Sequence, residues 1–216
     1  VVRRFFHDVN DKEGIRSNSI YSLLVDDRGA VWVGHFQAGL DYSLYQNGLF
    51  RTYAYLPQFN SANLSIRSFV NRGPEKVIGS RDGLFYINEA TGIVKSFVKP
   101  VLTSDLILTI CFYEGEYYIG TYGGGMMVLN PQTLSLKYFT QGDTELFQKG
   151  HIFCVKPDNR GNLWIGTSQG LFCYNGQTKQ IKNFTSTNSQ LPEGNVYEVS
   201  FDSTGKGWIA TETCMW

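Results

Sequence analysis

The chain has 216 residues, enough for one domain or two small ones, and 42% of them are hydrophobic and 15% aromatic, which allows a sizeable buried core. Its 19 Lys and Arg balance its 19 Asp and Glu, and this zero net charge argues against a nucleic-acid or anionic-membrane partner, since both require a basic face. No apolar run reaches the ~18 residues of a membrane-spanning helix.

The first predicted element is an outer strand at residues 3–7, and no partner strand precedes it. We therefore expect residues 1–10 to complete a preceding structural unit, or to close a ring by pairing with the last one. The first six residues are not a signal peptide and are typical of the middle of a strand. This start favours a piece of a longer protein.

A repeated unit then follows along the chain. In its first copy an apolar strand leads to Asp-x-x-Gly-x-x-Trp and on to a second strand, and the same spacing occurs three times, as Asp26, Gly29 and Trp32, as Asp158, Gly161 and Trp164, and as Asp202, Gly205 and Trp208. Two degenerate copies lie at 77–84 and 118–125. A small residue recurs at intervals of 45, 41, 46 and 44 residues, namely Gly34, Gly79, Gly120, Gly166 and Ala210. A period of about 40–45 residues is typical of β-propeller blades.

We therefore predict an all-β fold, a β-propeller segment of four-stranded antiparallel blades with strands a to d, comprising about four whole blades plus partial blades at both ends. The whole blades are expected at about 19–55, 65–98, 106–139 and 151–185, with a partial blade at 195–216. An open segment of a larger propeller is favoured over a small closed ring. No amphipathic helix is expected.

The repeated Asp, Gly and Trp have a structural interpretation. Each Asp is expected to accept hydrogen bonds from the backbone of its own a–b turn, and each Gly to take a positive φ. Each Trp can bury roughly 150–250 Å² between neighbouring blades. Because these residues recur at one place in the unit, turn and core roles are favoured over a carboxylate set or sugar-stacking platforms.

Metal, cofactor and disulfide chemistry has little support in the sequence. His7, His35 and His151 are scattered, so no metal site is expected, and no helix or lysine follows the glycines at 123–125, so neither a phosphate loop nor a cofactor is expected. Three of the four cysteines lie inside apolar strand patterns, which favours buried free thiols over disulfides; the four are Cys111, Cys154, Cys173 and Cys214.

Residues 158–171 and 17–34 resemble the two-component regulator propeller repeat of Bacteroides-type hybrid two-component sensor histidine kinases. The resemblance is strong in the first, fourth and fifth units and weak in the second and third. It implies the non-catalytic, periplasmic sensing region of an inner-membrane receptor that detects oligosaccharides and relays binding to a kinase elsewhere in the parent chain. The sequence departs from the repeat at 35–37, at Cys214 and in the second unit, which has 71–74 in place of the Asp-to-Trp core.

Candidate binding residues are those that vary between units. In a propeller the b–c loops and d–a connections share one face, and the mixture of aromatic, amide and charged groups in these loops suits a glycan, with stacking on Phe36 or Tyr122. The b–c loop candidates are His35, Phe36, Gln37, Arg81, Asp82, Tyr122, Ser168, Gln169 and Glu212. The d–a connections add Asn63, His151 and Asn195 with less weight.

Two other classes of function stay open. A sialidase-like propeller also has Asp-x-Gly-x-x-Trp turns, but Val25 occupies its Ser position and no arginine cluster with an activated tyrosine can be assembled. Exposed apolar b–c loops would instead favour a protein-interaction propeller. The expected partners are a glycan and other domains of the parent chain, with a homodimer as a further possibility, and no nucleic acid or membrane.

Overall fold

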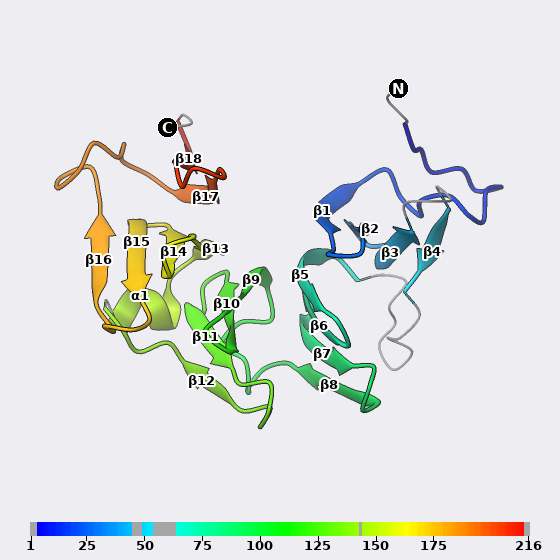
Figure 1. Ribbon diagram of the computed structural model, residues 1–216, viewed down its shortest axis with the longest axis horizontal. Helices are drawn as coiled ribbons and strands as arrows, with labels where there is room; N and C mark the ends of the chain where they lie inside the picture. Colours follow the sequence, from blue (N-terminus) through cyan, green and yellow to red (C-terminus); the bar gives the residue numbers. More distant parts are fainter. Residues whose placement is uncertain (1–3, 45–48, 54–63, 143, 214–216) are drawn as a thin grey trace. The chain divides into compact units, whose positions relative to one another are not determined.

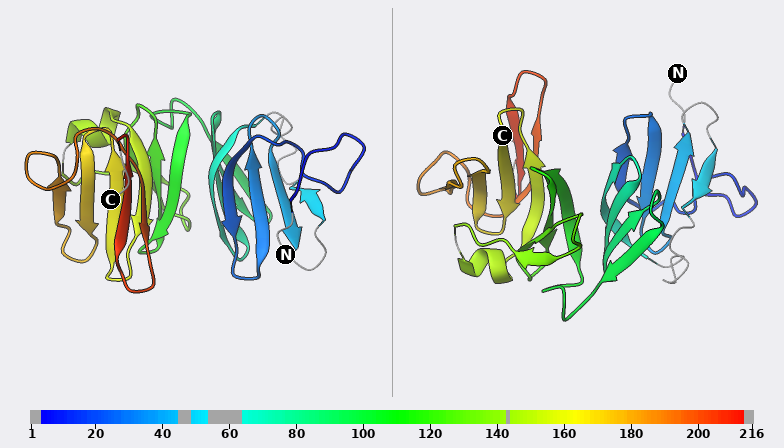
Figure 2. Two further views of the ribbon diagram at one scale, coloured as in Figure 1. Left: turned by 90° about the horizontal axis from the view of Figure 1, so that it is seen from above. Right: turned by 60° about the horizontal axis from the view of Figure 1, so that its bottom comes forward.

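The computed structural model describes residues 4–44, 49–53, 64–142 and 144–213, and these form two compact units divided at residues 96 and 97. Cys214 and Asn63 lie outside the described residues. The fold is all-β, as predicted, and consists of antiparallel sheets whose strands follow one another in chain order (Figures 1 and 2).

The first unit contains two four-stranded sheets. One is formed by β1 (Ile20–Val25), β2 (Ala30–His35), β3 (Leu40–Leu44) and β4 (Phe50–Thr52). The other is formed by β5 (Ile66–Arg72), β6 (Glu75–Ser80), β7 (Gly83–Asn88) and β8 (Ile93–Phe97), whose last residue begins the second unit. A shared core joins the sheets and includes Trp32, Phe69 and Phe85.

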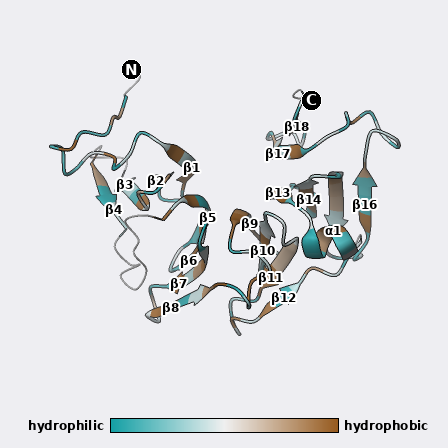
Figure 3. Cartoon of the chain, turned by 180° about the vertical axis from the view of Figure 1, so that it is seen from behind, coloured by the Kyte–Doolittle hydropathy of each residue, from teal (hydrophilic) through white to brown (hydrophobic). Residues whose placement is uncertain are grey.

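The second unit contains two four-stranded sheets and a two-stranded one. The first consists of β9 (Ile107–Tyr113), β10 (Glu116–Thr121), β11 (Met126–Leu129) and β12 (Leu136–Tyr138). The second consists of β13 (Ile152–Pro157), β14 (Asn162–Thr167), β15 (Gly170–Asn175) and β16 (Ile181–Phe184). β17 (Val196–Phe201) pairs with β18 (Gly207–Thr211). Apolar residues mark inner strands such as β1 and β9 (Figure 3).

Two expectations about local structure were wrong. Residues 4–7 form no strand; the Phe5 ring instead packs edge-on against Phe50 in β4 at 5.2 Å, and the His7 amide donates to the Asn18 side chain. The segment thus binds side chains of its own unit rather than the edge of a sheet. The second difference from expectation is a short helix between two of the sheets.

Helix α1 (Thr144–Lys149) connects β12 to β13, where no helix was expected. Six residues are too few to produce a helical periodicity in the sequence. Packing holds the helix in place, since Leu146 and Phe147 are almost completely buried and the Phe147 ring lies 5.3 Å from that of Phe172 in β15. The described residues include no helix long and apolar enough to cross a bilayer.

The Asp carboxylates organise the a–b turns. Asp26 Oδ1 accepts from the amides of Arg28 and Ala30, and its Oδ2 accepts from the Trp32 indole at 3.0 Å. Asp158 repeats this arrangement, with the Trp164 indole 2.9 Å from its Oδ2. Gly29, Gly161 and Gly205 have φ of 76°, 81° and 84°, which favours glycine at each turn. One carboxylate therefore connects the turn to the core aromatic side chain.

The fifth repeat differs from the others. Asp202 accepts from the backbone of Thr204 and Lys206, yet no described hydrogen bond joins it to Trp208. The Trp208 ring is 42% exposed, and the Lys206 ammonium lies 4.3 Å from its centroid. Trp208 is therefore only partly buried among the described residues, unlike Trp32 in the first blade, which is 4% exposed.

The degenerate blades use other side chains for the same task. In the second sheet Asn71 donates to Asp26 of the first sheet at 2.8 Å. In the third sheet Tyr113 reaches the fourth, where its hydroxyl donates to the Gly161 carbonyl at 2.7 Å and accepts from the Gly176 amide at 2.9 Å. These contacts connect neighbouring blades within each unit.

The thiols of Cys111, Cys154 and Cys173 are free, as predicted. Cys111 and Cys154 are buried, and burial raises the pKa of each thiol to about 12. Both are therefore uncharged, unreactive core groups at neutral pH.

We predict that Tyr113→Phe lowers the free energy of unfolding by about 1–3 kcal/mol, because the change removes one hydroxyl and leaves two backbone groups without a partner. Urea denaturation measures the effect. Tyr138→Phe is the matched control, since that ring is 48% exposed on β12. Equal stability of the two variants would contradict the bridging role.

A second prediction concerns acid. Burial alone would raise the pKa of Asp26, but hydrogen bonds from Trp32, Ala30 and Arg28 outweigh it and lower the pKa, and Asp158 behaves in the same way. In the unfolded chain these carboxyls have a pKa of about 4. The contribution of Asp26 and Asp158 to folding stability is therefore complete above that pH and is lost as the pH falls through the lower pKa of the folded state.

The double variant Asp26→Asn, Asp158→Asn is therefore expected to be less stable at neutral pH and to lose less stability on acidification below about pH 4. Urea denaturation across this range gives both values. Asp27→Asn, at an exposed position beside the first turn, serves as the control. An unchanged slope in the double variant would show that other groups govern acid unfolding.

Candidate functional site

A β-bulge recurs at the start of the inner strand of all five sheets. The register skips one residue between Ile20 and Ser22, and an equivalent skip occurs in each of the other four inner strands. The bulged residues are Tyr21, Arg67, Leu108, Phe153 and Tyr197. A bulge leaves its extra residue outside the ladder and redirects its side chain, and bulges are common beside functional sites.

The b–c loop of each blade is attached to the residue just before this strand. The amide of Tyr122 donates to the Leu106 carbonyl, and four other loops repeat the bond, through the pairs Phe36–Ser19, Arg81–Ser65, Ser168–His151 and Glu212–Asn195. These bonds measure 2.9–3.2 Å. They hold each variable loop beside a bulged residue, so the loops and the d–a connections share a rim, as the sequence predicted.

In the second unit this arrangement produces a continuous set of rings, here called the aromatic row: Tyr122, His151, Phe153 and Tyr197. The Tyr122 and His151 rings stack at 4.0 Å with an interplanar angle of 28°. The His151 and Phe153 centroids are 6.1 Å apart, and those of Phe153 and Tyr197 are 4.9 Å apart. Tyr122 is 50% exposed and Tyr197 42% exposed, so both ends of the row are open to solvent.

Polar groups accompany the row. Asn195 donates to the Tyr197 hydroxyl at 3.0 Å and to Glu212 Oε2 at 3.4 Å. The Nδ1 atom of His151 is buried and has no hydrogen-bond partner among the described residues. The rim therefore combines open aromatic faces with an amide, a carboxylate and an imidazole nitrogen.

The structure brings some of the predicted residues together and separates others. Tyr122, His151, Asn195 and Glu212 belong to the rim of the second unit, while Gln169 is exposed on the loop after β14, next to Ser168, whose amide donates to the His151 carbonyl. In the first unit the Phe36 ring lies 5.3 Å from that of Tyr21, and the side chains of Gln37, Arg81 and Asp82 are exposed or partly exposed.

His35 cannot serve the predicted role as a surface ligand. Its side chain is 0% exposed, and its Nε2 lies 2.9 Å from Asp41 Oδ2. Asp41 also accepts from the Arg16 amide and the Thr52 hydroxyl. Burial in this network makes His35 part of the framework under the b–c loop.

Sequence reasoning missed the bulged residues Tyr21, Arg67, Phe153 and Tyr197. A signal was present: in four of the five repeats a β-branched residue at the start of the inner strand is followed by a larger side chain, as in 20–21, 152–153 and 196–197. Apolar strand residues were assigned to the core, and only the register reveals which one is bulged.

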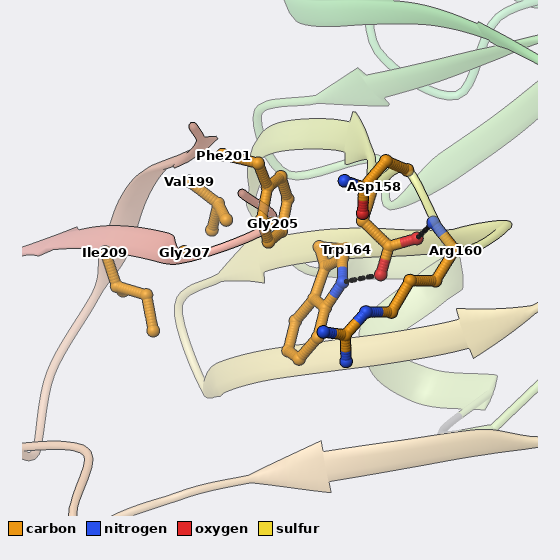
Figure 4. Close-up of a pocket in the computed structure, with 9 residues that line it drawn as sticks. Asp158, Arg160, Trp164, Val199, Phe201, Gly205, Gly207 and Ile209 are labelled. Carbon is orange, nitrogen blue, oxygen red and sulfur yellow. Dashed lines mark hydrogen bonds between the residues drawn. The ribbon is translucent and has the colours of Figure 1, made fainter. Parts of the chain in front are cut away.

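A small cleft lies between the fourth sheet and β17–β18, beside the a–b turns (Figure 4). Its volume of about 160 Å³ is below the roughly 300–1,000 Å³ of ordinary ligand pockets. Its lining residues include Asp158, whose oxygens already accept from Arg160 and Trp164, as Figure 4 shows. The rim is therefore the better candidate site.

The family "Two component regulator propeller" matches residues 14–37 and 147–169. These two segments are similar to two-component regulator propeller repeats. Both matched segments include an a–b turn and a bulged residue, Tyr21 in one and Phe153 in the other. The match thus covers the first two strands of the first and fourth blades, two of the three units in which the sequence resemblance is strong.

Solved structures extend the similarity over nearly the whole chain. The extracellular domain described as that of hybrid two-component system BT3049 from B. thetaiotaomicron is 25% identical, with a TM-score of 0.72, over 95% of this chain and 28% of that one. The corresponding domain of BT4673 is 17% identical, with a TM-score of 0.62, over 98% and 32%. PorZ, a surface component of the type-IX secretion system of Porphyromonas gingivalis, is 15% identical, with a TM-score of 0.69, over 91% and 31%.

The latter two similarities concern the propeller fold alone. The chain spans less than a third of the length of each of these structures. No curated protein matches the sequence significantly.

We predict that His35→Ala lowers the free energy of unfolding by about 2–4 kcal/mol, because Asp41 stays buried without its imidazole partner. Urea denaturation checks the loss, and Gln169→Ala, an exposed loop change, is the control. Full stability together with loss of ligand binding would instead show that His35 contacts the ligand.

Proposed function

We propose that this regulator propeller is part of a periplasmic sensor that binds an oligosaccharide on the aromatic row and relays binding to a kinase elsewhere in its parent protein. The proposal is supported by the regulator propeller match and by the 25% identity to the extracellular domain of a hybrid two-component system. The chain itself acts as a binding module and not as an enzyme.

The aromatic row is the observation that carries the proposal. Sugar rings have apolar C–H faces that pack on aromatic rings, and their hydroxyls require hydrogen-bonding groups nearby. Tyr122 and Tyr197 offer half-exposed rings, while Asn195 and Glu212 supply an amide and a carboxylate at one end. A row of several rings suits a chain of several sugars better than a single one.

Glycan hydrolysis is less well supported. The carboxylate at the sialidase-type position is Asp27, and the equivalent positions of the other two turns hold Asn159 and Ser203. The neighbouring Asp26 and Asp158 accept hydrogen bonds from their own turns and from tryptophan indoles, so they are occupied as structural groups. The row itself contains no pair of carboxylates that could act as acid and base.

Relay requires that the ligand bind one arrangement of the sensor better than another, because equal affinity for two states shifts neither. A ligand spanning Tyr122 to Tyr197 would contact three blades of the second unit at once. Such a ligand would discriminate between arrangements in which these blades differ in spacing. Differential binding is thus available at the rim without a large closure.

Calorimetry of the intact ectodomain against a panel of oligosaccharides tests the function. We expect one class of oligosaccharide to bind, and Tyr122→Ala and Tyr197→Ala each to weaken it about tenfold or more, since tenfold corresponds to about 1.4 kcal/mol of stacking. Tyr138→Ala, on an exposed outer strand, should leave the affinity unchanged.

Absence of binding to every oligosaccharide would contradict the proposed ligand class. Turnover of any of them would move the assignment to an enzyme. Unchanged affinity in both tyrosine variants, with binding intact, would exclude the aromatic row as the site.

A further inference from the structure

The first unit uses the bulged positions differently from the second. Tyr21 in β1 and Arg67 in β5 are bulged residues of neighbouring inner strands, and the Arg67 guanidinium carbon lies 4.8 Å from the Tyr21 ring centroid. The Phe36 ring, on the b–c loop of the first blade, is 5.3 Å from Tyr21. The bulged position next to Tyr21 therefore carries a guanidinium, whereas the bulged positions in the aromatic row of the second unit carry rings.

The Arg67 guanidinium has a hydrogen-bond donor without an acceptor among the described residues. Its Nε is buried and has no hydrogen-bond partner among the described residues, and no described carboxylate forms an ion pair with it. A buried donor without a partner costs free energy, and contact with an aromatic face does not satisfy an N–H in the plane of the guanidinium. The guanidinium is thus oriented by Tyr21 but not neutralised.

The backbone around Arg67 is held firmly. Ser65 accepts from the Arg81 amide through its carbonyl at 3.1 Å and from the Gln37 amide through its hydroxyl at 3.3 Å. Ser65 therefore fixes two b–c loops beside the bulge that carries Arg67. The Arg81 side chain is exposed, which places a second cation on one of these loops.

Two carboxylates of the same unit, Asp41 and Asp82, do not supply the missing charge. Asp41 is 1% exposed and already accepts from His35, Arg16 and Thr52. Asp82, next to Arg81, is exposed and forms no described ion pair with either arginine. The requirement at Arg67 is therefore for an acceptor that comes from outside the described residues.

We infer that Arg67 is an anion-binding residue, which receives a carboxylate or sulfate group of a saccharide while Phe36 and Tyr21 contact the sugar ring. A guanidinium offers paired donors that match the oxygens of both groups. The saccharide rests on the function proposed above, whereas the anion subsite is a property of the first unit. Arg81 adds an exposed positive charge on a b–c loop that Ser65 fixes.

Two measurements on the intact ectodomain test this inference separately from the proposed function. The first follows the Arg67 Nε–H resonance by NMR during titration with sodium sulfate, with sodium chloride at equal ionic strength as control. We expect a saturable shift with sulfate alone. Arg67→Lys should lose the resonance and serves to assign it.

The second measurement compares a tetramer of galacturonic acid with its methyl ester, and a sulfated chondroitin disaccharide with its unsulfated form, by calorimetry. At least one anionic member should bind ten times more tightly than its neutral counterpart. Arg67→Gln should abolish that preference and Arg67→Lys should keep part of it. Arg51→Gln, on the exposed outer strand β4, should keep all of it.

The outcomes separate the two proposals. No sulfate-dependent shift at Arg67, together with equal affinity for charged and neutral saccharides, overturns the anion subsite even if Tyr197→Ala weakens neutral sugars. An unchanged charge preference in Arg67→Gln, with near-UV circular dichroism showing a folded protein, also overturns it. Loss of the preference in Arg67→Gln with no effect of Tyr197→Ala supports the subsite and removes the aromatic row.

Discussion

In the first and fourth blades the a–b turn depends on one carboxylate, which accepts hydrogen bonds both from the turn backbone and from the tryptophan of the next strand. Asp26 and Asp158 each use Oδ1 for the turn amides and Oδ2 for the indole N–H six residues later. A buried indole needs a hydrogen-bond acceptor, and a buried carboxylate needs donors, so each group makes burial of the other favourable. The rest of the blade is built outward from this pair.

The blades that lack the pair show that the constraint is general. In the first unit Lys76 is only 4% exposed, pairs with Glu89 and lies 5.9 Å from the Trp32 ring, while Tyr53 donates to the same carboxylate. In the second unit Tyr113 satisfies two backbone groups of the following blade. Different residues thus meet the same requirement, that polar groups between packed sheets find partners.

The opposite end of each blade is organised by backbone geometry. The recurring bulge releases one residue per inner strand, and the bond from each b–c loop to the preceding connection keeps variable side chains beside it. Because the backbone supplies this framework, the bulged residue can change without harming the blade. Tyrosine, arginine, leucine and phenylalanine all occur there, which gives the two units rims of different chemistry.

The sequence by itself determined the blade repeat, the propeller class and the turn roles of Asp26, Gly29 and their equivalents, because these depend on local hydrogen bonds and a fixed spacing. It also pointed to the b–c loops, since loops vary where the framework does not. Only the tertiary structure decided that His35 is buried against Asp41, that residues 4–7 pack as coil and that α1 forms at 144–149. The tertiary structure alone also decided that four rings meet in one row, those of Tyr122, His151, Phe153 and Tyr197. The physical reason is that a strand pattern gives the alternation of side chains but not the register between strands, and a bulge changes that register by a single residue.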